Sequence, residues 1–339
     1  MCTVRKVHLA RFSVGKTLLR SLVLLLALGA AALAGPVYNF TDFAFQGATN
    51  NFVYAINNSG YVSGDGYSAN WSDYWGEVCH GTTCTTLVPP GSTGMWVFRL
   101  NNAGTVVGGF GYPDDPAGVT HGVIYQAGTY TVYSDAVRQP ELGFTAINDT
   151  GLIVGHYGFM GNDVGMSFLY NGVTAVDLTD PNGVVTNPDV QGINDAGVMV
   201  GYYGPGLSQS FIYAGGVFTP VAYPGATSTQ LNDINNLGWA IGNWSNGSGG
   251  GGGFLYKDGV FVPLPNMIVP APWGPWVVIP NYMSINDYGV VAGWHGAYDA
   301  NGNWYLAGFT GDPIPEPGTW ALVWAGIVAL AALRRRTSR

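Results

Sequence analysis

The chain of 339 residues carries little charge, and its central part has almost no positive charge. Charged residues make up 9% of the chain, and of its 12 Lys and Arg only Arg99, Arg138 and Lys257 lie between Gly35 and Pro313. The same stretch holds nearly all of the 20 Asp and Glu, so its net charge is strongly negative. A surface of that sign repels phosphates and anionic polymers. The composition therefore excludes nucleic acid as a partner.

Cysteine is equally scarce, with three in the chain. Cys2 lies in the N-terminal leader described below, which leaves Cys79 and Cys84 as a close pair. In an oxidising compartment such a pair is expected to form a disulfide across a hairpin. A metal site is the alternative, but two cysteines with His80 between them provide too few ligands. The sequence predicts the disulfide and no cofactor.

Catalytic signatures are also missing. The chain contains no G-x-S-x-G, no H-E-x-x-H and no P-loop. The glycine run at 249–253 lacks the Lys and the Ser or Thr that phosphate binding needs, so it reads as a flexible loop.

What the chain does contain is one short unit repeated six times. Each copy is an apolar strand, an Asn-Asn or Asn-Asp pair, a glycine and a second strand, as in AINDTGLIVG at 146–155. Asn opens a hairpin turn of this kind, and Gly takes the positive φ. The turn asparagines are spaced by 41 to 51 residues and are Asn57, Asn101, Asn148, Asn194, Asn235 and Asn286.

Two further strands follow the turn, such as SFIY at 210–213 and VFTPV at 217–221. Four strands in roughly 45 residues is the size of one propeller blade. An orphan strand at 37–43 precedes the first copy, and the last copy stops one strand short after 304–309. We therefore predict an all-β, six-bladed β-propeller-like domain over 35–311, closed by pairing of 37–43 with 304–309. A β-solenoid is the rival architecture, although its coils are usually much shorter.

Hydrophobic runs mark the two ends of the chain. At the N-terminus, five basic residues precede an apolar core and an A-x-A site formed by Ala32 and Ala34. Residues 1–34 are therefore predicted to be a signal peptide for the Sec export machinery. An uncleaved anchor helix is the alternative.

The C-terminal segment 312–339 combines three signals in a fixed order. A Pro-Glu-Pro triplet precedes an uncharged stretch at 319–333, which predicts a short transmembrane helix, and a basic cluster follows. A buried helix of a soluble domain is the alternative. The residues that carry the two polar signals are Pro315, Glu316, Pro317, Arg334, Arg335 and Arg336.

This tail resembles the PEP-CTERM sorting domain of Gram-negative bacteria. The resemblance implies recognition by an exosortase, removal of the tail near the triplet, and release to the cell surface or the exopolysaccharide matrix. The repeats, over roughly 37–309, resemble the HAF-type extracellular repeat of secreted bacterial proteins through their I-N-D-x-G-x-V-V-G and G-F-L-Y cores. That resemblance implies a propeller-like fold and transfers no activity.

Candidate ligand-binding residues follow the second strand of several copies. If the blades are equivalent, these residues form a ring around one rim of the propeller. Two tryptophans on a proline-rich loop could stack on sugar rings. Ordinary strand-end and loop packing is the alternative for both groups. The candidates are His156, Tyr202, Trp244, Trp294, His295, Trp273 and Trp276.

The Asn-Asp turns raise the question of calcium. Calcium needs six to eight oxygens and each turn offers few, so capping of the turn by its own Asn side chain is the preferred interpretation.

We predict an exported, non-catalytic protein that binds or scaffolds extracellular polysaccharide. The alternative is a secreted hydrolase or lyase of matrix glycans, with carboxylates around a central channel. Its candidates are Asp65, Asp149, Asp195 and Asp287, but their repeat-equivalent placement favours a role in the turns.

Overall fold

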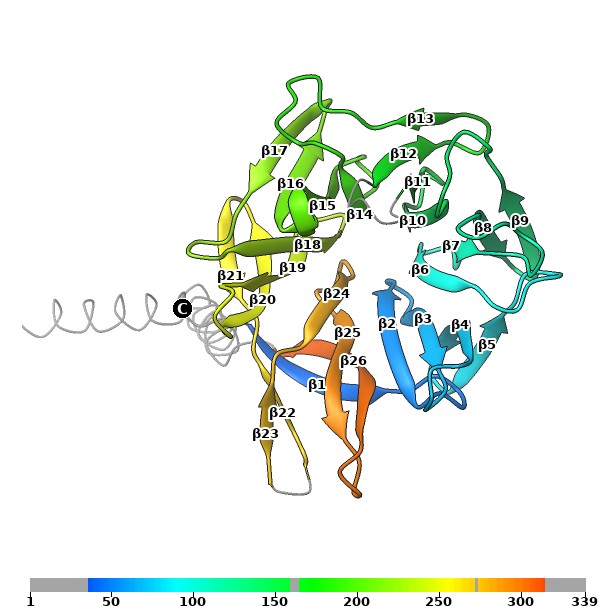
Figure 1. Cartoon of the computed structure of the whole chain (residues 1–339). Coiled ribbons are helices and arrows are strands. Elements are labelled where there is room, and N and C mark those ends of the chain that lie inside the picture. The colour runs from blue at the N-terminus through cyan, green and yellow to red at the C-terminus, as the bar shows by residue number, and fades with distance from the viewer. Residues whose placement is uncertain (1–35, 159–164, 272–273, 315–339) are drawn as a thin grey trace, which may run out of the picture. The chain divides into compact units, whose positions relative to one another are not determined.

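Each sequence repeat folds into a four-stranded antiparallel sheet, and six such sheets are arranged as the blades of a β-propeller around a central axis (Figure 1). The computed structural model describes residues 36–158, 165–271 and 274–314. The predicted signal peptide, the Pro-Glu-Pro triplet, the transmembrane helix and the basic cluster lie outside these residues. Within them, no helix has the length and apolarity needed to cross a membrane.

Blades 1 to 3 follow one another along the chain. Blade 1 comprises β2 Asn50–Ile56, β3 Tyr61–Tyr67, β4 Tyr74–His80 and β5 Thr83–Leu87. Blade 2 comprises β6 Trp96–Leu100, β7 Val106–Phe110, β8 His121–Gln126 and β9 Thr129–Tyr133. Blade 3 comprises β10 Gly143–Ile147, β11 Ile153–Tyr157, β12 Met166–Tyr170 and β13 Ala175–Asp177.

The second half repeats the pattern, with a short 3-10 helix, η1 Pro205–Leu207, inside blade 4. Blade 4 comprises β14 Asp189–Ile193, β15 Met199–Tyr203, β16 Gln209–Ala214 and β17 Val217–Val221. Blade 5 comprises β18 Ser228–Ile234, β19 Ala240–Ser245, β20 Gly251–Lys257 and β21 Val260–Pro263. Blade 6 comprises β24 Asn281–Ile285, β25 Val291–Tyr298, β26 Trp304–Ile314 and, from the other end of the domain, β1 Val37–Phe43.

The pairing of β1 with β26 closes the ring. The register runs from Val37 opposite Ile314 to Phe43 opposite Gly308. This confirms that the N-terminal strand completes the last blade. The partner segment is 308–314, further along the chain than the 304–309 we expected, because β26 is long and continues to Ile314.

Between blades 5 and 6 the chain forms an additional hairpin. Its strands, β22 Met267–Val269 and β23 Trp276–Val278, pair with each other as a separate two-stranded sheet. The hairpin projects from the ring beside the end of the β25–β26 hairpin (Figure 1). This insertion accounts for the longest of the repeat spacings.

The hydrophobic core is divided into six clusters, one in each interface between neighbouring blades. The cluster between blades 6 and 1, for example, joins Ala292 of β25 to Val53 of β2. A closed ring has no interface left open, so every blade is covered on both faces.

Candidate functional site

The six repeat turns meet at one end of the propeller axis, which we call the turn face. In each turn the Asn side-chain oxygen accepts hydrogen bonds from backbone N–H groups two or four residues further on, as Asn57 does from Ser59 and Tyr61. The glycine three residues after it has a positive φ in all six copies, for example 79° at Gly60 and 83° at Gly151. The turn asparagines therefore cap their own turns.

The same asparagines also join the blades. Each amide nitrogen donates a hydrogen bond to the backbone oxygen of the turn Asn in the next blade, and the sixth bond, from Asn286 to Asn57 at 3.1 Å, closes the circle. The other five bonds measure 3.0 to 3.2 Å. Sequence reasoning anticipated the capping and missed this second role.

A second circle is formed by the residue that follows each turn Asn. Its side-chain oxygen accepts the backbone N–H of the corresponding residue in the preceding blade, as Asp195 does from Asp149 at 2.8 Å. Only an oxygen acceptor is needed there, and both Asn and Asp supply one. That explains why the repeats alternate freely between Asn-Asn and Asn-Asp. The six residues are Asn58, Asn102, Asp149, Asp195, Asn236 and Asp287.

One arginine occupies the channel beneath these circles. The innermost strand of every blade carries a β-bulge at the same place, and the Arg99 guanidinium binds the backbone oxygens of three bulge residues from other blades. It donates to Tyr54 and Asn232 at 2.5 Å and to Met283 at 3.0 Å. Its Nε lies 3.8 Å from a carboxylate oxygen of Asp233. We call the Arg99 side chain the channel plug. A cavity of about 70 Å³ remains between it and the turns.

The buried carboxylates near the channel serve as hydrogen-bond acceptors. Burial raises the pKa of Asp233, opposed by Arg99, and its oxygens accept bonds from Ser284 Oγ and the Ile285 N–H. Asp65 accepts the Val97 N–H of the next blade at 2.8 Å, and burial raises its pKa well above the usual range. The carboxylates considered for glycan hydrolysis are thus tied to the backbone of neighbouring blades.

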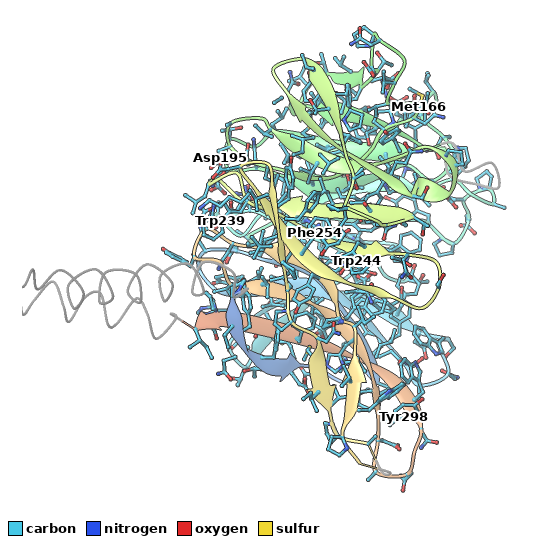
Figure 2. The ribbon with its side chains drawn as sticks, turned by 90° about the vertical axis from the view of Figure 1, so that its left-hand side faces the viewer. Met166, Asp195, Trp239, Trp244, Phe254 and Tyr298 are labelled. Carbon is cyan, nitrogen blue, oxygen red and sulfur yellow. A yellow bond between two sulfur atoms is a disulfide. The ribbon has the colours of Figure 1, made fainter. Side chains whose placement is uncertain are left out.

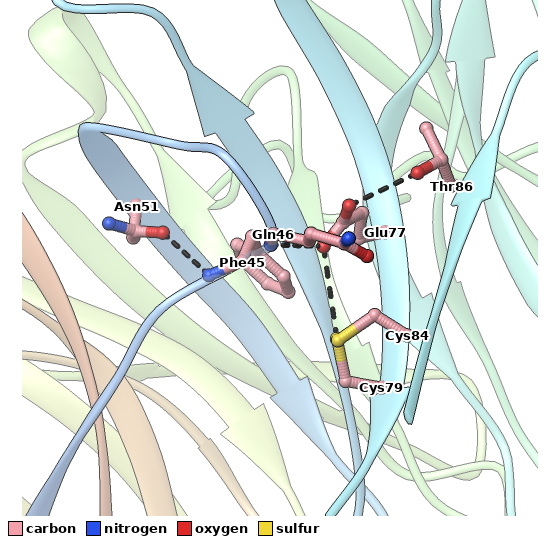
Figure 3. The surroundings of a disulfide bond; sticks show 7 residues. All are labelled: Phe45, Gln46, Asn51, Glu77, Cys79, Cys84 and Thr86. Atoms are coloured by element: carbon pink, nitrogen blue, oxygen red, sulfur yellow. Dashed lines mark hydrogen bonds between the residues drawn. A yellow bond between two sulfur atoms is a disulfide. The ribbon is translucent and has the colours of Figure 1, made fainter. Parts of the chain in front are cut away.

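Cys79 and Cys84 form a disulfide across the β4–β5 hairpin (Figure 3). The neighbouring Glu77 is buried and accepts bonds from the Gln46 N–H at 2.9 Å and from Thr86 Oγ1 at 3.1 Å. Within the described ranges, Glu77, Cys79 and Cys84 are the only group of three potential metal ligands, and two of its three ligand atoms are the bonded sulfurs.

The opposite face of the propeller carries a cluster of aromatic rings. Strand β3 starts at the Asn57 turn and ends in a loop at the other end of the blade, so Trp71 in that loop lies far from the turn face. Figure 2 shows the two ends, with Asp195 and Trp239 at one edge and Tyr298 towards the other.

Trp71 is the most exposed member of this cluster. Its side chain is 49% exposed, and its ring centre lies 5.3 Å from Tyr67 and 6.1 Å from Phe52. Its φ is +63°, a left-handed conformation that is unusual for a bulky residue and costs about 1–2 kcal/mol. The loop holds it there through a bond from the Trp71 N–H to the Ser68 oxygen at 3.1 Å.

Half-buried rings extend the cluster in both directions from Trp71. On one side Tyr67 is 5.9 Å from Tyr74, which stacks on Trp96 of blade 2 at 5.3 Å and an angle of 6°. On the other side Phe52 meets Trp294 of blade 6 at 5.0 Å. We call this set the aromatic strip: Trp96, Tyr74, Tyr67, Trp71, Phe52 and Trp294. Only Trp71 of this set is exposed, and the other five rings are half-buried beside it.

The predicted rim residues do not form a single ring, because they belong to two neighbouring strand positions whose side chains point to opposite faces of the blade. His156, Tyr202 and Trp294 share one position, opposite the starts of β10, β14 and β24. Trp244 and His295 lie one residue further along.

Most of these side chains fill the spaces within and between blades. The Tyr202 hydroxyl donates to Asn232 Oδ1. Trp244 stacks on Tyr223 at 4.7 Å. His295 is buried, with its Nε2 3.3 Å from an Asp42 oxygen.

His156 lies beside Phe98, and desolvation lowers its pKa to about 4. Trp294 belongs to the aromatic strip, and Trp276 lies on the β22–β23 hairpin, 39% exposed. Trp273 lies outside the described residues.

No family model matches this chain, and neither does any curated protein. Among solved structures, the chain is similar to AofleA from Arthrobotrys oligospora. The two are 10% identical with a TM-score of 0.47, over 83% of this chain and 91% of the other.

Proposed function

We propose that this β-propeller is an exported, non-catalytic protein that binds extracellular polysaccharide through the aromatic strip. The observation that carries the proposal is the exposed Trp71, held in a strained conformation above two further rings. Strain of this kind persists only where the surrounding structure enforces it, and it concentrates at functional sites. Aromatic rings offer flat apolar surfaces with polar edges, which suits the apolar faces and hydroxyl rims of sugars.

The termini support a location outside the cell. The A-x-A leader favours export by the Sec pathway, and the C-terminal tail resembles a PEP-CTERM signal that an exosortase would process. The HAF-type resemblance of the repeats agrees with a secreted protein. In this proposal the mature chain is held at the membrane for a time and then reaches the surface or the polysaccharide matrix.

Retention on polysaccharide tests the binding proposal. The purified full chain is passed over immobilised extracellular polysaccharide from a Gram-negative host, beside the Trp71→Ala variant. Retention of the wild type and its loss in the variant are expected. Tyr288→Ala is the matched control, because Tyr288 is an aromatic residue 71% exposed on the turn face. Absence of wild-type retention would overturn the proposal.

The export proposal has a separate test. Mass spectrometry of the mature termini, after fractionation of the host, should find an N-terminus at Gly35 and a C-terminus near Pro315–Gly318 in the matrix or medium. An intact tail in the membrane fraction would exclude processing by an exosortase.

A further inference from the structure

The hairpin of β25 and β26 continues the aromatic strip beyond blade 1. These strands have 8 and 11 residues, whereas the corresponding strands of blade 3 have 5 each. Along β25 the residues alternate: Trp294, Gly296 and Tyr298 are half-exposed, while His295 and Ala297 are buried. Successive odd and even positions of a strand face opposite sides, so the first three share one outward surface.

Trp304 of β26 bridges the space between Trp294 and Tyr298. Its indole lies directly on Gly296, where an added Cβ would come within 1.7 Å of the ring. Only glycine leaves room for the ring at this position. Trp304 is 52% exposed, and its ring centre is 5.1 Å from Tyr298. The row of rings that starts at Trp96 therefore continues along the hairpin.

The β22–β23 hairpin adds a further ring to this row. Trp276 lies 5.2 Å from Tyr298 and 6.2 Å from Trp304, so an insertion from between blades 5 and 6 meets the end of the blade 6 hairpin. At about 3.4 Å per residue, the backbone from Trp294 to Tyr298 alone covers about 14 Å. That length exceeds a single sugar ring, and the row as a whole is longer.

The charges restrict what this row can bind. Each of the three cationic side chains between Gly35 and Pro313 is already engaged. Arg99 occupies the channel, Arg138 contacts Asp135 at 2.5 Å and Asp177 at 2.8 Å, and Lys257 lies 4.2 Å from the Trp239 ring. A polyanion would find acidic groups and no unengaged cation here.

A carboxylate in the turn that joins β25 and β26 strengthens this restriction. Hydrogen bonds from Asn303 lower the pKa of the exposed Asp299, so it stays negatively charged at neutral pH.

We infer that the aromatic strip and its extension through Trp304, Tyr298 and Trp276 form one linear site for an uncharged polysaccharide chain. Several consecutive sugars lie along the row, and affinity rises with chain length until the row is filled. This inference rests on the proposed function and deepens it by naming the ligand class and the direction in which the polymer lies.

A length series tests the inference. Binding of the full chain to a disaccharide and to long oligomers of the same uncharged glucan is measured by calorimetry, for the wild type and a Trp276→Ala/Trp304→Ala double variant. The wild type is expected to bind the long oligomer much more tightly. The double variant should lose roughly tenfold of that affinity, which is about 1.4 kcal/mol, because it lacks two rings of the row. It should bind the disaccharide as before.

Three controls make the outcome decisive. The variant with Phe at both positions keeps the rings and should recover most of the affinity, and thermal unfolding checks that all variants are folded. Polygalacturonate, a polyanion, should not bind. Equal affinity for short and long oligomers, or an unaffected double variant while Trp71→Ala still abolishes retention, would overturn the inference and leave the proposed function standing. If the wild type binds no glycan at all, both fail.

Discussion

The two faces of this propeller are built from the same six repeats and have opposite characters. The turn face is nearly identical in every blade, and its side chains bond to backbone groups of the neighbouring turns in two closed circles. The opposite face differs from blade to blade, and its aromatic strip runs over blades 6, 1 and 2. The residues that repeat in every blade therefore hold the ring together. The residues that differ between blades include the exposed aromatic rings.

The comparison separates residues that hold the ring closed from residues that are free to bind. A group whose hydrogen bonds are all made inside the protein has little left for a ligand, whereas an exposed ring in a strained loop keeps one face open to a ligand. Substitutions on the turn face and in the channel should thus change stability, and substitutions on the strip should change binding.

Loss of the channel plug is expected to have the largest effect on stability. Arg99→Met leaves the bulge oxygens of Tyr54, Asn232 and Met283 without a donor and Asp233 without its cation. Breaking a buried ion pair from one side costs about 3–5 kcal/mol, which urea unfolding at neutral pH would show. Lys257→Met is the matched control, since an exposed cation over a ring contributes only about 0.5–1 kcal/mol. Equal losses of stability in the two variants would mean that Arg99 only packs in the channel and that its charge and hydrogen bonds contribute nothing further.

The next largest effect on stability is expected at Asp189, and it depends on pH. Burial raises the pKa of Asp189 to about 7 from 3.8. Between about pH 4 and pH 7 the unfolded chain therefore releases a proton that the folded chain retains, so this group makes folding less favourable as the pH rises. Asp189→Asn should be more stable than the wild type at pH 8, by about 2–4 kcal/mol, and nearly equal to it at pH 4.

Thermal unfolding at both pH values measures this difference. His156 has the opposite slope, because its lowered pKa removes stability as the pH falls from 6.5 towards 4. It is present in both proteins and cancels in the comparison. A stability difference that does not change with pH would show that Asp189 titrates normally.

The sequence alone predicted the propeller architecture, but it did not predict which residues form the aromatic strip on the surface. The repeat spacing predicted six four-stranded blades and closure by 37–43, because hairpins and blade size are local properties. The strip was missed because it joins residues as far apart as Phe52 and Trp294, which no local pattern connects. The plug had a signal that could have been found. Two residues before the turn Asn, four of the six repeats have Ala, Gly or Ser. Arg99 and Asp233 occupy this position in the other two, and they face each other in the channel.

Substitutions in the two hydrogen-bond circles of the turn face should change stability less, and by different amounts in the two circles. Asn148→Ala removes the cap of its own turn and the bond to Asn194 in the next blade, and should cost about 1–3 kcal/mol. Asp195→Asn keeps the oxygen that accepts the Asp149 N–H, so its stability should stay within about 0.5 kcal/mol of the wild type. Chemical denaturation of both variants distinguishes the circles. A large loss in Asp195→Asn would show that its negative charge, and not just its oxygen, is required.

The smallest effect on stability is expected where the effect on binding is greatest. Trp71→Gly removes an exposed ring and also removes the cost of a positive φ, since glycine adopts that conformation freely. The lost contacts with Phe52 and Tyr67 and the relieved strain nearly offset each other, so the free energy of unfolding should change by less than about 1 kcal/mol. Trp71→Ala keeps the strain without the ring and should be the less stable of the two. If both variants still bind polysaccharide as the wild type does, the opposite face is not the binding face, and the contrast between the two faces concerns folding alone.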